Sequence, residues 1–294
     1  MARTQLKILA FLMALTITLC CIAAAYYVYS KILSPSQQLE AELEQLRATN
    51  IKRPDPAIKR FEAAMALVRA GQIPQAREAL YKLLQQFPKS ALAAESRRII
   101  GEINLDELFS PDQKTGKLGY IVQPGDSLAL IASRQSTNMD MIIRLNGLMG
   151  GTLKPGDRLL IAPLDFSLVA DLANQSLTLR RRAADREYFF KEYSAEIRLP
   201  GGLKAPAELE LRSKSATLNG QPVLSSDPRH LTADKIIPTN RAGLVIRRRP
   251  AQAPQAQTAG NQPSARDPGI FLAPEQFEEL FALVRNGSKL YLIR

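Results

Sequence analysis

The pattern of hydrophobic and polar residues divides the chain into segments with different predicted structures. An uncharged apolar run extends from Ile8 to Tyr29, and a polar, helix-forming stretch follows it from Ser34 to Asn50. Residues 57–108 place apolar side chains at helical spacing, whereas the part after Leu164 shows the alternation and turn signals of strands. Between them, residues 119–162 combine short strand and short helix patterns. The chain is therefore predicted to be a multidomain α+β protein.

The apolar run is long enough to cross a bilayer as a helix, and Arg3 and Lys7 precede it. By the positive-inside rule, these charges keep the amino terminus in the cytoplasm and place the rest of the chain outside. We predict for residues 1–33 a cytoplasmic tip and a single-pass anchor, with residues 8–29 in the inner or cytoplasmic membrane and the bulk of the chain on the periplasmic or extracytoplasmic side. A cleaved signal peptide is the alternative, because Ala23-Ala24-Ala25 offers a cleavage site. Both alternatives export the remainder.

Residues 34–110 are predicted to be a helical stalk followed by three helices. The helices are expected over residues 57–70, 75–87 and 91–103, because glycine and proline separate these segments. Six positions in these helices resemble the pattern of the tetratricopeptide repeat. They are Ala63, Gly71, Ala76, Ala79, Leu80 and Pro88. The resemblance covers about one and a half units, whereas a free-standing array needs about three. The helical region could therefore be a packing region or spacer, or it could form a groove for a protein partner, and the sequence does not decide between these roles.

The segment 119–162 begins with a short strand and a helix. Apolar residues make Gly119–Val122 a strand, and Gln123-Pro124-Gly125 ends it. Asp126 or Ser127 is expected to cap the following helix. The apolar face of that helix repeats at helical spacing through Leu128, Ile131 and Ala132.

A second helix and a second strand complete this segment. Thr137 and Asp140 predict the start of the helix by their capping-box spacing, and Asn146-Gly147 predicts its end. The turn 154–157 then leads into the strand 158–161. Over residues 118–163 the chain resembles the LysM domain through its segments PGDSL, LNGL and LKPGDRL, in this order. The resemblance implies a β-α-α-β module that binds N-acetylglucosamine-containing glycans.

The resemblance also implies a shallow glycan groove between the loop after the first strand and the loop before the second. Its residues would be Gly125, Asp126, Ser127, Leu128, Leu148, Gly150, Gly151, Leu153 and Pro155. Exposed main chain would bind sugar hydroxyls and acetamido groups, over an apolar floor. Alternatively, Asp126 only caps the helix, and the pair Gly150-Gly151 only lets the chain turn between helix and strand. The remaining large apolar residues are expected in the core, and they are Tyr120, Ile131, Ile142, Leu145, Leu159 and Ile161.

Residues 164–294 are predicted to form a mainly-β domain. Asn174-Gln175 and Asn219-Gly220 mark hairpins, and residues 251–264 form a low-complexity loop. A helix that begins at Pro274 and a strand over Lys289–Ile293 end the chain.

Two portions of this domain, residues 170–197 and 274–293, resemble the L,D-transpeptidase catalytic domain. That family uses a cysteine in a motif of the form S-H-G-C-x-R, with a histidine upstream. Here Gly269 falls at the cysteine, Asp267 at the histidine and Phe271 at the arginine, and the upstream histidine motif falls near Arg247. A glycine has no side chain to carry an acyl group. The domain is therefore predicted to be a pseudoenzyme without catalytic residues.

The formal net charge of +11 suits anionic surroundings such as a membrane surface or cell-wall polymers. A nucleic-acid partner is not expected, because the chain has no tryptophan and no nucleic-acid motif. The two cysteines, Cys20 and Cys21, lie inside the apolar run, so the rest of the chain has no thiol. His230 is the single histidine and is expected at the surface of a polar loop. Neither a metal site nor a cofactor is predicted.

These observations predict an exported, membrane-anchored protein that binds peptidoglycan glycan strands and tethers or scaffolds at the cell wall. One alternative is a cell-wall enzyme of the L,D-transpeptidase type that uses unrecognised residues. Another is an adaptor that recruits a protein partner through its helical region while the LysM module localises it.

Overall fold

The computed structural model describes residues 2–30, 55–148, 153–183, 186–250 and 267–294, and the side chains from Met13 onward. It forms two compact units, Met1–Asp55 and Pro56–Arg294. The stalk predicted over residues 34–50 and the loop predicted over residues 251–264 lie outside the described residues.

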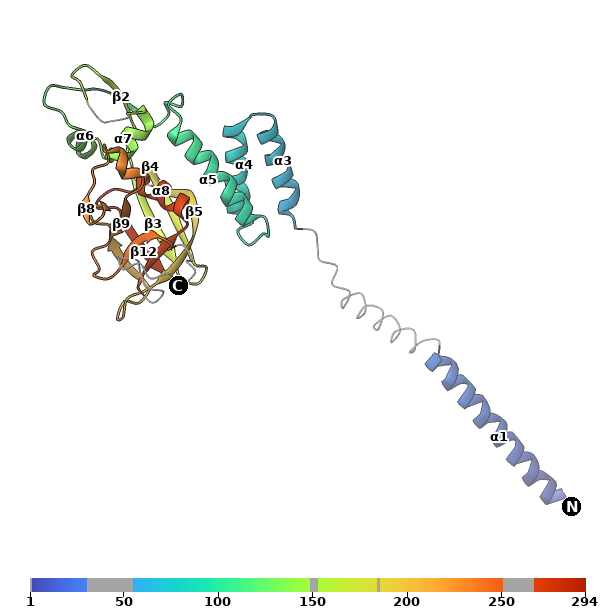
Figure 1. The fold of residues 1–294 in the computed structure, drawn as a ribbon. Coiled ribbons are helices and arrows are strands. Elements are labelled where there is room, and N and C mark those ends of the chain that lie inside the picture. The colour runs from blue at the N-terminus through green and yellow to red at the C-terminus, as the bar shows by residue number, and fades with distance from the viewer. Residues whose placement is uncertain (1, 31–54, 149–152, 184–185, 251–266) are drawn as a thin grey trace. The chain divides into compact units, whose positions relative to one another are not determined.

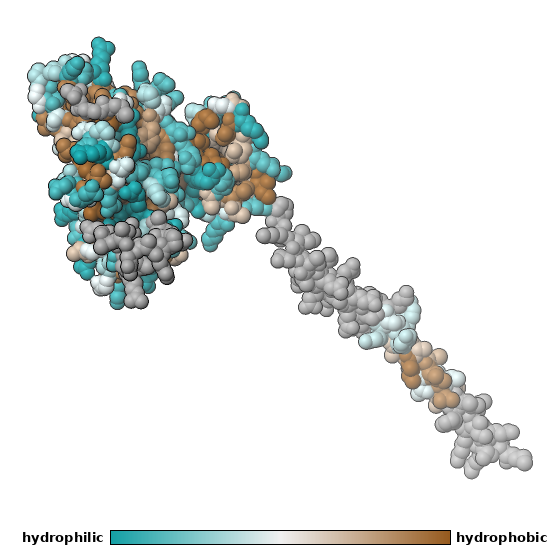
Figure 2. Space-filling model, in the orientation of Figure 1, coloured by the Kyte–Doolittle hydropathy of each residue, from teal (hydrophilic) through white to brown (hydrophobic). Residues whose placement is uncertain are grey.

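The first unit contains helix α1 (Ala2–Val28), which includes most of the apolar run (Figure 1). Its described side chains are exposed and largely apolar, as the brown atoms of Figure 2 show. No helix in the described part of the chain is both long and apolar enough to cross a membrane. The transmembrane helix expected over residues 8–29 stays a prediction.

The second unit begins with three helices that pack in sequence, α3 (Ala57–Arg69), α4 (Ile73–Gln86) and α5 (Ala93–Phe109). Gly71 has a φ of 72° in the turn between α3 and α4, a conformation that favours glycine. Helix α4 starts two residues before the predicted position because Pro74 fits the first turn of a helix. A small cluster of buried apolar side chains joins the helices through Ala64, Leu80 and Ile100.

The LysM segment has the predicted order of elements, β1 (Leu118–Ile121), α6 (Leu128–Arg134), α7 (Met139–Asn146) and β2 (Arg158–Ile161). The two strands are antiparallel, and Tyr120 pairs with Leu159. A core of its own lies between strands and helices, formed by Val122, Leu128, Ile131, Ala132, Ile142, Leu159 and Ile161. Helix α7 ends at Gly147, which has a φ of 61° in the left-handed region as its Asn-Gly sequence predicts.

Two details of this segment differ from the prediction. Asn138, rather than Thr137, caps α7, because its side-chain oxygen accepts a 2.8 Å hydrogen bond from the N–H of Met141. Leu145 is buried, as expected, but it packs in the core of the β-domain together with Met141. Helix α7 therefore faces two cores at once.

The β-domain is built on one sheet with the strand order β6-β12-β3-β4-β5-β11-β10-β9-β7-β8. The pairs β3–β12 and β10–β11 are parallel and the other pairs are antiparallel. The elements are β3 (Phe166–Asp171), β4 (Ser176–Ala183), β5 (Arg186–Arg198), β6 (Ala207–Glu210), β7 (Ser215–Leu218), β8 (Gln221–Pro222), the 3-10 helix η2 (Pro228–Leu231), β9 (Asp234–Pro238), β10 (Val245–Arg248), β11 (Gly269–Leu272), α8 (Pro274–Leu283) and β12 (Lys289–Ile293). Both predicted hairpins are confirmed, with Gln175 and Asn219 at positive φ.

A single large core joins the β-domain to the helices and to the LysM segment. It includes Leu105 and Leu108 of α5, Met141 and Leu145 of α7, and many side chains of the sheet and α8. Buried hydrogen bonds reinforce the same contacts, since the side chain of Asn138 donates to the carbonyls of Ala282 and Val284, each at 2.8 Å. The described residues between Pro56 and Arg294 therefore form one compact unit.

Candidate functional site

Two turns with the sequence Pro-Gly-Asp lie side by side at one end of the β1–β2 ribbon. In the first turn, the N–H of Asp126 donates to the carbonyl of Gln123 at 3.1 Å. In the second, the N–H of Asp157 donates to the carbonyl of Lys154 at 3.0 Å. Val122 joins the two turns, because it donates to Asp157 and accepts from Gly156, both at 2.9 Å. The described parts of the two loops expected to form the groove thus meet at these turns.

The glycine of each turn adopts a conformation that other residues rarely adopt. Gly125 has a φ of 85° and Gly156 a φ of 95°, which suits the third position of a type II turn after proline. A Cβ atom at either position would meet no atom within 4 Å. The glycines are therefore required by backbone conformation, and they leave open space above the turns.

Each aspartate closes its own turn with a side-chain hydrogen bond. The carboxylates of Asp126 and Asp157 accept from the N–H groups of Gln123 and Lys154, each at 2.8 Å. Pro-Gly-Asp is thus a structural unit that occurs twice in the module. This repetition favours a turn-stabilising role for Asp126 over a direct glycan contact.

Asp126 has further internal partners that occupy its carboxylate. The hydroxyl of Tyr120 donates to Oδ2 at 2.6 Å, and Arg134 lies 3.4 Å from Oδ1. Only 2% of the Asp126 side chain is exposed. The hydrogen bonds from Tyr120 and Gln123 hold the pKa of Asp126 below its usual value, and the same contact raises the pKa of Tyr120. Asp126 therefore ties the first turn to β1 and α6.

The neighbouring residues divide between structural and exposed positions. Ser127 is exposed and caps α6, because its hydroxyl accepts from the N–H of Leu130 at 3.2 Å. Leu128 is buried in the module core, whereas Leu148 and Leu153 are half-buried against it. Pro155 is exposed in the second turn.

The predicted glycine pair, Gly150 and Gly151, lies outside the described residues. Among the described members of the predicted groove, Gly125, Ser127 and Pro155 have exposed surface, and Leu148 and Leu153 provide partly accessible apolar surface.

A buried polar cluster lies between α7 and the β-domain, and no sequence pattern predicts it. Asp140 contacts Lys214 at 2.8 Å, and His230 Nε2 lies 3.8 Å from Asp140 Oδ1. Lys214 also donates to the carbonyl of Phe281. These side chains line a cleft of about 560 Å³ between the LysM segment and the β7–β8 hairpin.

The expectation that His230 lies at the surface is wrong. The exposed fraction of His230 is 6%. The loop that carries it has a polar sequence, but α7 and α8 cover the histidine. Burial lowers the pKa of His230, although the nearby carboxylate of Asp140 opposes this effect. Burial also lowers the pKa of Lys214. Burial alone would raise the pKa of Asp140, but the charge and hydrogen bond of Lys214 lower it.

The position predicted for a transpeptidase cysteine is closed in this chain. Gly269 lies in β11, beside Arg198 of β5. A Cβ atom on Gly269 would lie 2.9 Å from Cζ of Phe271 and 3.2 Å from the carbonyl oxygen of Val245. The guanidinium of Arg198 stacks 4.8 Å above the Phe271 ring and holds it in place. Within the described residues, no group of three or more histidine, cysteine, aspartate or glutamate side chains is placed to hold a metal ion.

Comparison with known proteins identifies one part of the chain by sequence. Residues 120–162 match the LysM domain, which confirms the resemblance of this segment. No curated protein matches the chain.

Solved structures with a related arrangement include three from bacteria. Bd1075 of Bdellovibrio bacteriovorus is 12% identical over 43% of this chain and 47% of its own, with a TM-score of 0.31. L,D-transpeptidase 1 of Mycobacterium tuberculosis is 14% identical over 49% of this chain and 69% of its own, with a TM-score of 0.28. An L,D-transpeptidase of Enterococcus faecium is 18% identical over 48% and 53%, with a TM-score of 0.29. The chain spans about half the length of the first of these structures, and similarity at this level carries no conclusion about activity.

Proposed function

We propose that this protein binds the glycan strands of peptidoglycan through its LysM segment and acts as a non-covalent tether or scaffold at the cell wall. The match of residues 120–162 to the LysM domain carries the proposal. The paired Pro-Gly-Asp turns support it, because open glycines and prolines leave main-chain amides and carbonyls accessible to sugar hydroxyls.

The proposal includes a location outside the cytoplasm, with residues 8–29 as the membrane attachment. The uncharged apolar run and the basic residues before it support this location. Fractionation of the full-length protein tests it, because an anchored chain stays in the membrane pellet after alkaline extraction.

We further propose that the β-domain has no transpeptidase activity. Phe271 and the carbonyl of Val245 occupy the space that a side chain at residue 269 would need, which supports this proposal. Incubation of the full chain with muropeptides tests it, and any cross-linked or trimmed product would contradict it.

Sedimentation with purified peptidoglycan sacculi tests the glycan groove. Pro155→Trp places a bulky group at an exposed position of the second turn, where the main chain does not require proline. We expect this variant to lose sedimentation. Pro111→Trp is the matched control, because Pro111 is exposed but lies outside the predicted groove. Equal sedimentation of the two variants would count against the groove.

A further inference from the structure

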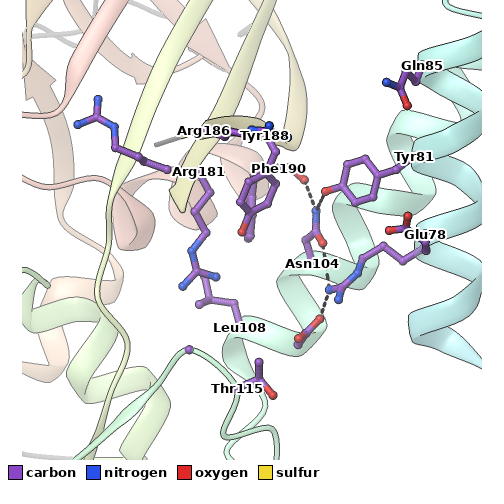
Figure 3. A pocket seen from close by; sticks show the side chains of 14 residues that line it. Glu78, Tyr81, Gln85, Asn104, Leu108, Thr115, Arg181, Arg186, Tyr188 and Phe190 are labelled. Atoms are coloured by element: carbon purple, nitrogen blue, oxygen red, sulfur yellow. Dashed lines mark hydrogen bonds and ion pairs between the residues drawn. The ribbon is translucent and has the colours of Figure 1, made fainter. Parts of the chain in front are cut away.

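A second cleft, of about 790 Å³, lies between the helical region and the hairpin formed by β4 and β5. Figure 3 shows Glu78 and Tyr81 on helix α4, and Arg181, Arg186 and Tyr188 on the hairpin. Thr115 and Gly116 close one end of the cleft, directly before the LysM segment begins at Leu118. The volume lies within the range of about 300–1,000 Å³ that is typical of small-ligand sites.

The floor of this cleft is fixed by hydrogen bonds between the helices and strand β5. The hydroxyl of Tyr81 donates to the carbonyl of Phe189 at 2.6 Å. Asn104 donates to the carbonyl of Phe190 at 2.8 Å and to the Tyr81 hydroxyl at 3.0 Å. Arg77 pairs with Glu107 beside them. The cleft is therefore a built feature of the fold, with its shape set before any ligand binds.

The rim of the cleft carries more arginine side chains than carboxylates that could pair with them. Arg182 pairs with Glu187 at 3.3 Å, and Glu78 pairs with Lys82 at 3.6 Å. Arg181 and Arg186 make no ion pair within the ranges that the structure describes, which omit residues 184 and 185. The guanidinium of Arg181 lies beside Gly116 and 5.8 Å above the ring of Phe166, so it is held inside the cleft.

We propose that this cleft binds a short peptide that carries free carboxylates, of the kind attached to peptidoglycan glycan strands. Guanidinium groups recognise carboxylates through paired hydrogen bonds. Tyr188, which is 37% exposed, offers an aromatic surface for an apolar side chain of the peptide. This inference rests on the proposed function, because the neighbouring LysM segment would supply the strand that bears the peptide.

Titration calorimetry with the full chain tests the inference. The probes are the tetrapeptide Ala-Glu-Lys-Ala with a free carboxyl end, the uncharged-end analogue Ala-Gln-Lys-Ala-amide, and a peptide-free N-acetylglucosamine oligomer. We expect the first peptide to bind at least tenfold more tightly than the analogue. We also expect its binding to weaken as salt concentration rises.

Three single substitutions locate the site. Arg181→Glu and Arg186→Glu should each weaken binding of the acidic peptide at least tenfold. Arg180→Glu makes the same charge change at a neighbouring exposed residue that does not line the cleft. The Arg180 variant should bind the peptide like the unmodified protein, and all three should keep their melting temperatures.

The outcomes separate this inference from the proposed function. Equal binding of the two peptides, or an equal loss in the Arg180 and Arg181 variants, would overturn the cleft proposal. Loss of oligomer binding with retained peptide binding would overturn the glycan proposal and leave the cleft. Retained oligomer binding in the Arg181 and Arg186 variants, with lost peptide binding, supports both.

Discussion

The hydroxyl of Tyr120 donates a 2.6 Å hydrogen bond to Oδ2 of Asp126, and this contact ties the first strand of the LysM segment to its first turn. The same oxygen accepts from the main chain of Gln123, so one carboxylate fixes both the strand and the turn. Asp126 therefore has a structural role in the turn that carries Gly125.

Replacement of Tyr120 by phenylalanine should lower the melting temperature and reduce the acid sensitivity of the fold. The Asp126 pKa is lowered in the folded protein, first by Tyr120 and then by Gln123. A lowered carboxyl pKa adds stability above the unfolded value of about 3.9, and that stability is lost as the pH falls through the folded value. Melting temperatures between pH 3 and 7 measure this effect.

Asp126→Asn should flatten the same profile further, because it removes the titrating group. Asp112→Asn, at an exposed aspartate outside the turns, is the control. A profile in Tyr120→Phe that is unchanged below pH 4 would contradict the assignment.

Asn138→Ala should destabilise the protein by about 2–4 kcal/mol. It removes the cap of α7, which is worth about 1 kcal/mol, and leaves two buried carbonyls without a donor at about 1–3 kcal/mol. Urea unfolding measures the loss. Asn174→Ala, in an exposed turn, should cost far less. Similar losses in both variants would show that α7 is not held to the β-domain by Asn138.

Several parts of this architecture could be predicted because their signals are local. Asn146-Gly147 marks the end of α7, and Asn219-Gly220 marks a hairpin, since each dipeptide adopts the positive φ that the turn needs. The sequence does not distinguish Asn138 from Thr137 as the cap of α7, because both are short polar residues. Only the approach of Ala282 and Val284, far along the chain, shows why Asn138 takes this position.

The buried cluster could not be predicted, because it also depends on contacts between residues that are far apart in the sequence. Asp140, Lys214 and His230 are distant in sequence, and each lies in a segment that is polar by itself. Their burial follows from the docking of α7 against the β-domain. The two-turn arrangement was accessible to sequence reasoning, whereas the cleft beside Arg181 depends on how α4, α5 and the β4–β5 hairpin meet.

Lys214→Met should destabilise the fold by about 3–5 kcal/mol, because it leaves the carboxylate of Asp140 buried without its partner. The double variant Asp140→Leu with Lys214→Met should recover part of the loss, since no unpaired charge stays behind. Chemical unfolding of the unmodified protein, the two single variants Asp140→Leu and Lys214→Met, and the double variant forms a double-mutant cycle. Simple additivity of the two single effects would show that the pair is not coupled.

The stability of the protein should fall between pH 7 and 5 through His230. Its pKa is lowered in the folded state, chiefly by burial, while Asp140 and Glu278 oppose the shift and Lys235 and Lys214 favour it. The unfolded chain therefore takes up a proton at about pH 6.5, before the folded protein does, and acidification favours unfolding. His230→Gln should remove this part of the pH dependence. An equally steep fall between pH 7 and 5 in that variant would assign the effect to other groups.

Gly269→Ala should destabilise the protein by about 1–3 kcal/mol, because its new methyl group would lie 2.9 Å from the ring of Phe271 and 3.2 Å from the carbonyl of Val245. The ring has little freedom to move, since it is 1% exposed and stacked by Arg198. Phe271→Ala alone should also be costly, as it leaves a cavity.

The double variant Gly269→Ala with Phe271→Ala should cost less than the sum of the two single changes, because the smaller side chain makes room for the methyl group. Thermal unfolding of the four proteins measures this coupling. Gly269→Cys should show no transpeptidase activity, since the same crowding meets the thiol and the single histidine, His230, lies in the cluster with Asp140. If Gly269→Ala caused no loss of stability, residue 269 would have room for a side chain. The crowding would then no longer support the proposal that the β-domain lacks transpeptidase activity.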